Sequence, residues 1–329
     1  MTESLEPIPA RSLPVSARSP GKCILFGEHA VVHGAPELVF AIDLPTQVIV
    51  SPSEARSLNS DRNASEHNAY FRTAMERSWA DGPPVAVRVV SRVPRSAGLG
   101  SSAAFVAALA AALGSATGGI RRADLAQRAF EIERGAQGVG SAGDTTAVVG
   151  GGYLAVNGGQ GEALWTIDGG DRTWVARRVE DPHWVWVVCH SGIPRATGDA
   201  VRAVTARLAR PDGPALLAEF ARVAEDGIRA VGRGDRATVA ELLGRNQELL
   251  REVGVSHPRL EALLEAARPA AEGAKLTGAG AGGSIVVLPK PGEEVDLVRR
   301  LARAGGLAFV VRAEPTGTTL VDAPAGPAA

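Results

Sequence analysis

Cysteine is nearly absent from the chain: Cys23 and Cys189 are the only two in 329 residues. Two cysteines cannot build a disulfide framework or a cysteine-rich zinc site, and their scarcity favours a reducing compartment. A secretory signal is also lacking, because residues 1–12 carry acidic residues and two prolines where a basic and then an apolar segment would be needed. No run of about 18 apolar residues occurs anywhere. We therefore expect a cytoplasmic protein that has no membrane partner.

Lysine is almost as scarce as cysteine. Of the 35 basic residues only three are lysines, namely Lys22, Lys275 and Lys290. Because a surface charge in this chain is usually an arginine, a lysine beside a glycine-rich loop is a candidate for a specific role, and Lys22 and Lys275 are both placed in this way. The net charge of −1 excludes a general affinity for polyanions, so we expect no nucleic-acid partner.

Length and composition indicate a globular chain of two domains. The sequence is 45% hydrophobic, and its 39 glycines lie between periodic segments rather than in repeats. The pattern changes near Asp181, because strands are frequent before it and amphipathic helices after it. We expect an N-terminal domain over residues 1–180, a C-terminal domain over 181–322 and a disordered tail over 323–329.

Hydrophobic periodicity and turn residues predict the elements of an α/β chain. Helices are expected at 63–79, 101–113, 122–136, 196–209, 215–231, 236–253, 257–267 and 293–304. Strands are expected on both sides of a turn at Pro20-Gly21, and then near 48–50, 85–93, at the end of the stretch 137–156, and near 174–179, 184–189, 284–288 and 307–311. Asp144 is expected in a short turn that follows a glycine loop, and a helix is expected to precede the glycine loop at 278–283.

The stretch from Val93 to Leu113, VPRSAGLGSSAAFVAALAAAL, is the feature around which the chain is organised. A valine-rich strand leads into a small-residue loop and then into a helix that has no polar face, so the helix must be buried on every side. Its first N–H groups lack partners and its dipole favours an anion there. Gly98 and Gly100 permit a close backbone approach, and Ser101 and Ser102 add hydroxyls. By itself the stretch also fits an ordinary serine-capped buried helix.

Common nucleotide-binding patterns do not explain these loops. Gly278, Gly280 and Gly283 match G-x-G-x-x-G, but a strand follows them where a dinucleotide-binding fold needs a helix. The loop at Gly98 has the right order, yet the chain has no acidic strand end about twenty residues later. No glycine is followed by Lys and then Ser or Thr, and the H-R-D and D-F-G signatures of protein kinases are absent.

Three motifs in this order resemble the GHMP kinase superfamily. They are SPGKCILFGEHAVVHG at 19–34, PRSAGLGSSAA at 94–104 and KLTGAGAGG at 275–283. Within the superfamily the sequence is most similar to mevalonate kinases, including the shorter archaeal type. The resemblance implies a two-domain α/β fold with the active site in the cleft between the domains. It also implies transfer of the ATP γ-phosphoryl group to the 5-hydroxyl of mevalonate, in isoprenoid biosynthesis, by a homodimer.

The resemblance also implies the parts of a phosphoryl-transfer site. The loop that wraps the ATP phosphates falls on Pro94, Ala97, Gly98, Leu99, Gly100, Ser101, Ser102 and Ala103. Ser102 and Glu133 would hold Mg²⁺, which prefers oxygen ligands and few protein contacts. Asp144, eleven residues beyond Glu133, would act as general base, and Lys22 would neutralise charge on Asp144 and on the migrating group. Taken alone, Glu133 also fits a solvated helix-face charge and Asp144 a helix cap.

Acceptor contacts are implied by two further segments. Glu28 and His29 match the family's G-E-H segment, and Thr277, Gly278 and Ala279 would reach the acceptor from the second domain. A zinc pair formed by His29 and a histidine four residues later has no third ligand in the sequence.

Some residues depart from the usual mevalonate kinase pattern. Residues 140–145 read G-S-A-G-D-T where P-S-G-x-D-N is common, Glu37 occupies a usually small apolar position, and Pro45 replaces a frequent arginine. The acceptor therefore stays open between mevalonate and another GHMP kinase substrate: phosphomevalonate, the 3-hydroxyl of mevalonate, homoserine or a sugar. A non-catalytic ligand sensor on the same fold is the alternative of another class.

Overall fold

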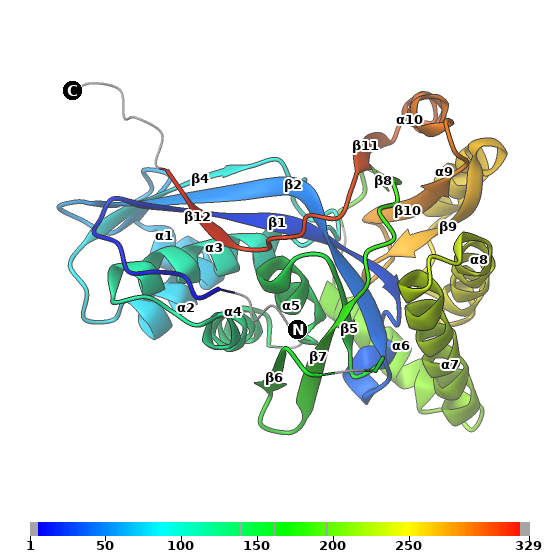
Figure 1. Cartoon of the computed structure of the whole chain (residues 1–329), viewed down its shortest axis with the longest axis horizontal. Helices are drawn as coiled ribbons and strands as arrows, with labels where there is room; N and C mark the ends of the chain where they lie inside the picture. The colour runs from blue at the N-terminus through cyan, green and yellow to red at the C-terminus, as the bar shows by residue number, and fades with distance from the viewer. Residues whose placement is uncertain (1–5, 139, 161, 195–196, 323–329) are drawn as a thin grey trace.

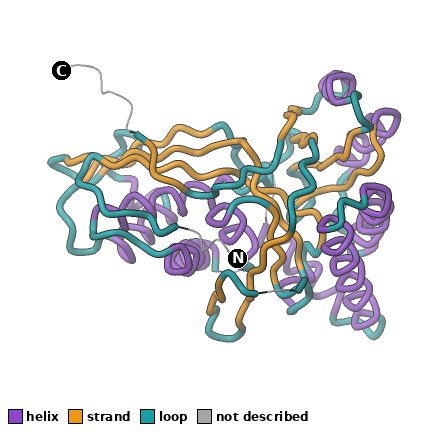
Figure 2. The backbone as a smooth tube through the Cα atoms, viewed as in Figure 1, coloured by secondary structure: helices purple, strands orange, loops and turns teal. Residues whose placement is uncertain are grey.

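The computed structural model describes residues 6–138, 140–160, 162–194 and 197–322, and the expected tail at 323–329 lies outside these ranges. The described chain forms two antiparallel-rich sheets with helices packed on them (Figures 1 and 2). Within the described ranges, no helix is both long and apolar enough to cross a membrane.

The larger sheet is built mostly from the first half of the chain. Its strands are β1 (Val15–Phe26), β2 (Glu37–Pro52), β3 (Ser57–Leu58), β4 (Val85–Ser91), β5 (Tyr153–Val156), β6 (Trp165–Asp168), β7 (Thr173–Val179) and β12 (Thr319–Val321). They run in the order β12-β1-β2-β5-β7-β6, with β4 also paired to β2 and β3 paired to β4. All pairs are antiparallel except β3–β4.

Helices cover one face of the larger sheet. They are α1 (Ala64–His67), α2 (Ala69–Ser78), α3 (Ser101–Ala116), α4 (Arg122–Gln137) and α5 (Gly143–Gly150), and a 3₁₀ turn, η1 (Ala30–His33), joins β1 to β2. The alanine-rich α3 packs in a common core with Val15, Val48 and Val87 of the sheet. In Figure 1 this helix layer lies beneath β1, β2 and β4. A helix without a polar face is therefore accommodated because the sheet and its neighbouring helices surround it.

The smaller sheet belongs to the second half. Its strands β8 (Trp186–His190), β9 (Ala271–Thr277), β10 (Ser284–Pro289) and β11 (Leu307–Val311) pair antiparallel in the order β11-β8-β10-β9. The accompanying helices are α6 (Thr197–Leu208), α7 (Gly213–Gly232), α8 (Arg236–Glu252), α9 (Pro258–Ala267), η2 (Arg268–Ala270) and α10 (Glu294–Arg303).

An aromatic cluster joins the two sheets. The rings of Phe40 on β2 and Tyr153 on β5 stack at 5.0 Å, and Trp186 on β8 donates a hydrogen bond of 2.7 Å to the Tyr153 hydroxyl. One apolar core runs through this junction. The domain boundary near Asp181 stays a proposal. The smaller sheet does begin after this residue, with β8, but the C-terminal strand β12 belongs to the larger sheet.

Four local predictions were wrong. The helix expected at 63–79 is interrupted at Asn68, whose extended backbone separates α1 from α2. The break expected at Pro20-Gly21 is only a register shift within β1, where Pro20 lies opposite Pro45 and neither residue can donate to the ladder. The short turn expected around Asp144 is the helix α5, and the segment that precedes Gly278 is the strand β9. The helix-forming residues of β9 are held extended by pairing with β10, because tertiary contacts override local propensity.

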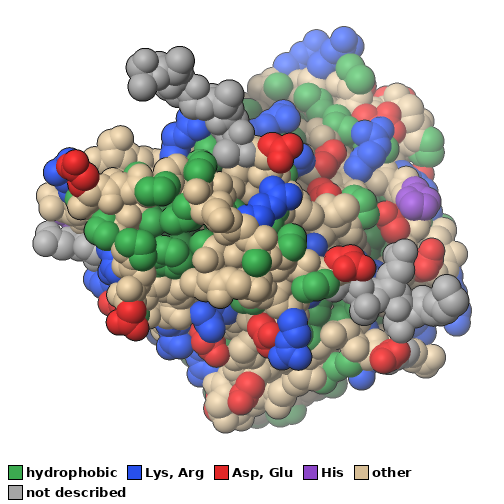
Figure 3. All heavy atoms as spheres, turned by 60° about the vertical axis from the view of Figure 1, so that its left-hand side comes forward, with side chains coloured by type: hydrophobic (Ala, Val, Ile, Leu, Met, Phe, Trp, Pro, Cys, Tyr) green, Lys and Arg blue, Asp and Glu red, His purple; other side chains and the backbone are tan. Residues whose placement is uncertain are grey.

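The space-filling view in Figure 3 shows one face of the molecule. Acidic and basic side chains lie interspersed on it among apolar and polar surface, in keeping with the net charge of −1. The field of these charges is therefore of mixed sign on that face.

Candidate active site

A cleft of about 760 Å³ receives side chains from β1, the loop at 93–100, α3, α4 and the loop that follows β9. Both halves of the chain therefore contribute to it. Several charged side chains converge in this cleft. Among the residues that line it are Lys22, Glu28, Ser102, Glu133, Asp144 and Ala279.

The loop before α3 is shaped by two glycines in the left-handed region, Gly98 at φ 83° and Gly100 at φ 76°. The Lys22 side chain crosses directly over Gly100, because a Cβ added to Gly100 would lie 2.6 Å from Lys22 Cγ. The Lys22 N–H also donates a hydrogen bond of 3.0 Å to the Leu99 carbonyl. The loop and β1 are thus packed together, and the first turn of α3, which carries no acidic residue, opens into the cleft.

The eight residues predicted for the phosphate loop divide into two groups. Gly98, Gly100, Ser101 and Ser102 line the cleft. The other four are not part of its lining, and three of them are buried in the apolar cores; these four are Pro94, Ala97, Leu99 and Ala103. The second group supports the loop from behind, which a short sequence motif cannot distinguish from contact with a ligand.

Lys22 and Asp144 form an ion pair on the floor of the cleft. Lys22 Nζ lies 2.6 Å from Asp144 Oδ1, and the side chains are 1% and 25% exposed. The lysine comes from the middle of β1, and the aspartate from the first turn of α5. The ammonium group is therefore buried while the carboxylate still faces the open space, where it can meet a ligand.

Ser102 and Glu133 also meet. Ser102 Oγ donates a hydrogen bond of 2.7 Å to Glu133 Oε1, and Gln137 Nε2 donates to the same oxygen at 3.1 Å. Both Ser102 and Glu133 line the cleft. In the described part of the chain, no group of three or more His, Cys, Asp or Glu side chains is arranged to hold a metal. A cation here would therefore need oxygen atoms from its ligand in addition to these two residues.

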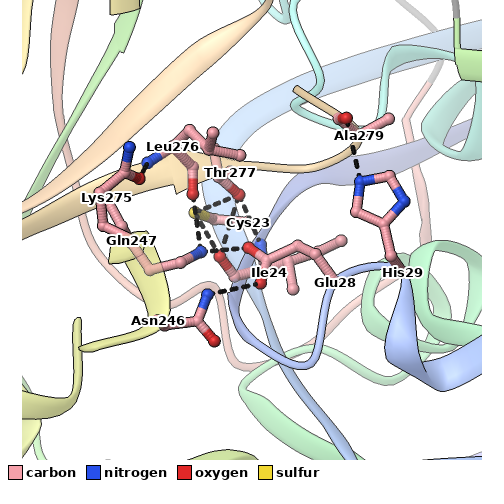
Figure 4. A network of polar contacts seen from close by, with 10 residues as sticks. All are labelled: Cys23, Ile24, Glu28, His29, Asn246, Gln247, Lys275, Leu276, Thr277 and Ala279. Atoms are coloured by element: carbon pink, nitrogen blue, oxygen red, sulfur yellow. Dashed lines mark hydrogen bonds and ion pairs between the residues drawn. The ribbon is translucent and has the colours of Figure 1, made fainter. Parts of the chain in front are cut away.

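Glu28 belongs to a buried network that joins the two halves of the protein (Figure 4). Its Oε1 is paired with Lys275 Nζ on β9, and its Oε2 accepts a hydrogen bond of 3.3 Å from Asn246 Nδ2 on α8. The side chains of Lys275 and Glu28 are 0% and 1% exposed. Charged groups in the protein interior need such ionic and hydrogen-bond partners, because an unpaired buried charge strongly destabilises the fold.

His29 and the loop after β9 approach each other across the cleft. His29 Nε2 donates a hydrogen bond of 3.0 Å to the Ala279 carbonyl (Figure 4), and His29, Gly278 and Ala279 all line the cleft. Thr277 does not. Its hydroxyl donates to the Ile24 carbonyl at 2.9 Å and accepts from the Ile24 N–H at 3.0 Å, so this side chain holds β9 against β1.

Glu37, which sequence reasoning singled out only as a departure, also lines the cleft. It is the first residue of β2 and is 1% exposed. Burial, followed by the nearby negative charge of Asp144, raises the pKa of Glu37 well above its usual value.

Asn246 and Gln247 were missed. Asn246 lies on the buried stripe of α8 with Val239 and Leu243, and Gln247 Oε1 accepts a hydrogen bond of 2.9 Å from the Leu276 N–H. The sequence does contain a signal for them, since two amide side chains occupy helix positions where the spacing calls for apolar residues. Buried polar groups need hydrogen-bond partners, so amides at such positions indicate contacts with another segment.

Comparisons with known proteins find similar sequences over most of the chain. Residues 68–152 match the family model of the GHMP kinases N terminal domain, and residues 228–306 match that of the GHMP kinases C terminal. A mevalonate kinase of Methanothermobacter thermautotrophicus is 33% identical over 301 residues, which cover 88% of this chain and 94% of the relative. A mevalonate kinase of Pyrococcus horikoshii is 30% identical, with 92% of this chain and 96% of the relative covered.

The fold is shared with solved structures. The crystal structure of L. major mevalonate kinase in complex with R-mevalonate superposes with a TM-score of 0.75 at 23% identity, covering 95% of this chain and 99% of the other.

Proposed function

Because the chain belongs to the GHMP kinase family, we propose that it is a mevalonate kinase that transfers the γ-phosphoryl group of ATP to the 5-hydroxyl of mevalonate, a step of isoprenoid biosynthesis. The observation that carries this proposal is the ion pair of Lys22 with Asp144, in the same cleft as the serine-tipped start of α3. Phosphoryl transfer needs positioning and charge neutralisation more than covalent chemistry, and the cleft offers groups for both.

The triphosphate of ATP would lie against the first turn of α3. The unpaired N–H groups and the positive end of the dipole favour an anion there. Gly98 and Gly100 line the cleft there, and Ser101 and Ser102 add hydroxyl groups. The helix carries no acidic residue in its first turn that would oppose phosphate binding.

Ser102 and Glu133 are the residues that would hold Mg²⁺ with the nucleotide. Both side chains offer oxygen atoms, which are the ligands that this ion prefers. The hydroxyl and the carboxylate lie 2.7 Å apart at the wall of the cleft. When bound, the ion neutralises charge on the phosphate oxygens.

Asp144 would orient the acceptor hydroxyl and accept its proton as the oxygen attacks the phosphoryl group. Lys22 would stabilise the negative charge that develops, because its ammonium group is fixed on Asp144 and pressed against the phosphate loop. The buried position of Lys22 keeps water from screening this charge.

The acceptor would be held by the opposite end of the cleft. His29, Gly278 and Ala279 line it there, and Glu28 is fixed by Lys275 and Asn246. The environment of Thr277 supports a structural role for that side chain rather than the acceptor contact expected for it.

An acceptor panel tests the proposed function. ADP release is measured with mevalonate, phosphomevalonate, homoserine and galactose, and the phosphorylated carbon of the product is located by phosphorus–carbon coupling in NMR spectra. We expect turnover with mevalonate and a phosphate on carbon 5. Turnover with another acceptor, or a product carrying phosphate on carbon 3, would replace the acceptor assignment, and ligand binding without any turnover would point to a sensor.

The proposal includes a homodimer, as the family resemblance implies, and a cytoplasmic location, as the scarcity of cysteine favours. Size-exclusion chromatography with light-scattering detection measures the mass of the protein in solution. A mass of twice 33.9 kDa supports the dimer, whereas a single chain contradicts it.

A further inference from the structure

Three carboxyl groups and two lysine ammonium groups come together around Glu37. Lys22 is paired with Asp144, and Lys275 with Glu28. Glu37 is the third acid, and both ammonium groups are already taken by the other two. The charges of both ion pairs act on Glu37. Because each lysine is already paired with another acid, the Glu37 carboxyl group has no counterion of its own.

The Glu37 carboxyl group is buried at the wall of the cleft. The residue is 1% exposed and lines the cleft, and its Oε2 has no hydrogen-bond partner among the described residues. The carboxyl group lies directly against the first turn of α5, because a Cβ added to Gly143 would overlap Oε2. Gly143 immediately precedes Asp144, so Glu37 is held beside the group that would meet the acceptor hydroxyl.

The protonation state follows from this environment. An ionised carboxylate without a counterion loses the hydration that stabilises its charge, and the nearby charge of Asp144 opposes ionisation further. Both effects raise the pKa of Glu37, with burial as the larger cause. A buried acid that keeps its proton becomes a hydrogen-bond donor, which an ionised carboxylate cannot be.

We propose that Glu37 is held as a neutral carboxylic acid in the acceptor pocket, where its O–H donates a hydrogen bond to an oxygen of the bound acceptor and thereby contributes to acceptor selection. This inference rests on the proposed function, because it deepens the description of the same acceptor site. Glu37 is a specificity-determining residue in this sense, and Asp144 and Lys22 keep the roles given above.

The proposal has a pH signature. Glu37 faces Lys22 and Asp144 in the cleft and lies within the field of Glu28 and Lys275. Deprotonation at alkaline pH removes the donor and adds an uncompensated negative charge beside Asp144. The acceptor KM therefore rises with pH, whereas the ATP KM, which depends on the α3 end of the cleft, stays nearly constant.

The experiment compares wild type with Glu37→Gln and Glu37→Ala in steady-state assays from pH 6 to pH 10. Glutamine keeps an N–H donor but cannot ionise, so we expect an acceptor KM within about threefold of wild type at neutral pH and no alkaline rise. Alanine removes the donor, so we expect the acceptor KM to be about tenfold higher, because this is the loss of affinity expected when one hydrogen bond is removed. An alkaline rise that persists in Glu37→Gln, or an unchanged KM in Glu37→Ala, would overturn the proposal.

Infrared spectra provide a readout that does not need turnover. The wild type at pH 7 should show the C=O band of a protonated carboxylic acid that Glu37→Gln lacks, and an identical spectrum in both proteins would contradict a neutral Glu37. If mevalonate is not the acceptor, the proposed function fails, and the same comparison is made with the acceptor that turns over. The two ideas can therefore fail separately.

Discussion

Ser102 Oγ and Glu133 Oε1 lie 2.7 Å apart, although 31 residues separate them in the chain. Their hydrogen bond ties the first turn of α3 to the last turns of α4, and both side chains line the cleft. A hydroxyl and a carboxylate held this close before any ligand arrives form a prepared pair of oxygen donors at the place where the phosphates would bind.

Replacing Ser102 with alanine should change the dependence on Mg²⁺. We expect Ser102→Ala to raise the Mg²⁺ concentration for half-maximal activity about tenfold, since one ligand is lost. The measurement is initial rate against free Mg²⁺ at saturating ATP. Ser115→Ala is the matched control: this serine is on the same helix, but its hydroxyl donates to the Pro9 carbonyl. An equal Mg²⁺ requirement in both variants would count against the assignment.

Asp144→Asn should separate chemistry from nucleotide binding. The amide keeps the shape of the side chain but cannot accept a proton, so we expect kcat to fall by about 10² to 10⁴. ATP affinity, measured by calorimetry, should stay within about threefold of wild type. Asp168→Asn, which changes an exposed aspartate of β6, should leave both quantities unchanged. Near-full activity of Asp144→Asn would remove this residue from the mechanism.

Gly100→Ala should damage the site more than the fold. A left-handed alanine costs about 1–2 kcal/mol, and its Cβ would also displace the Lys22 side chain. We expect a lower melting temperature and a rise of at least about tenfold in the ATP KM. Gly234→Ala has a similar φ of +67° but no atom within 4 Å of the added Cβ, so it should be destabilised and fully active. An equal ATP KM in the two variants would contradict the proposed effect of the contact between Lys22 and Gly100.

Removing only one member of the buried pair of Glu28 and Lys275 should destabilise the protein strongly. Lys275→Met leaves Glu28 as an uncompensated buried charge, which costs about 3–5 kcal/mol in the free energy of unfolding. The double variant Glu28→Gln/Lys275→Met should recover part of that loss. Urea unfolding of the two single variants and the double variant gives the coupling energy, and strictly additive effects would show that the pair is not coupled.

Glu37→Gln should stabilise the protein, increasingly so as the pH rises. The raised pKa of Glu37 means that the folded chain keeps a proton which the unfolded chain releases above pH about 4.3. The wild type therefore loses stability relative to the variant between that pH and the raised pKa, by about 1.4 kcal/mol per pH unit. Urea unfolding at a series of pH values measures the difference. Glu54→Gln, at an exposed position, should show no such trend, and a constant offset for Glu37→Gln would contradict the raised pKa.

The features that sequence reasoning captured are those encoded in short contiguous stretches. The family, the two-part α/β fold and the burial of the helix that begins at Ser101 were predicted from three motifs and from a helix with no polar face. The approach of Lys22 to Asp144 was expected from the family pattern, and the structure brings the two together, while their catalytic roles stay predictions.

What sequence reasoning could not supply depends on contacts between distant segments. The neutral state proposed for Glu37 depends mainly on its burial and, to a smaller extent, on the charge of Asp144. Neither can be inferred from the residues next to Glu37 in the sequence. β9 has the composition of a helix and is extended because β10 pairs with it. The loop residues Leu99 and Ala103 share a motif with Ser102, but only the fold decides which of them faces the cleft.

The short strand β12 has a consequence for the order in which the protein is made. It pairs with β1 opposite residues 16–18, and Thr318, just before it, exchanges a hydrogen bond of 3.0 Å with Ser19. On the ribosome, β12 is translated after every other described element, so the edge of β1 stays open while the remainder of the sheet assembles. The strand that carries Lys22 is therefore among the first to emerge and the last to be fully paired, and nascent chains stalled before residue 319 would present that bare edge to chaperones.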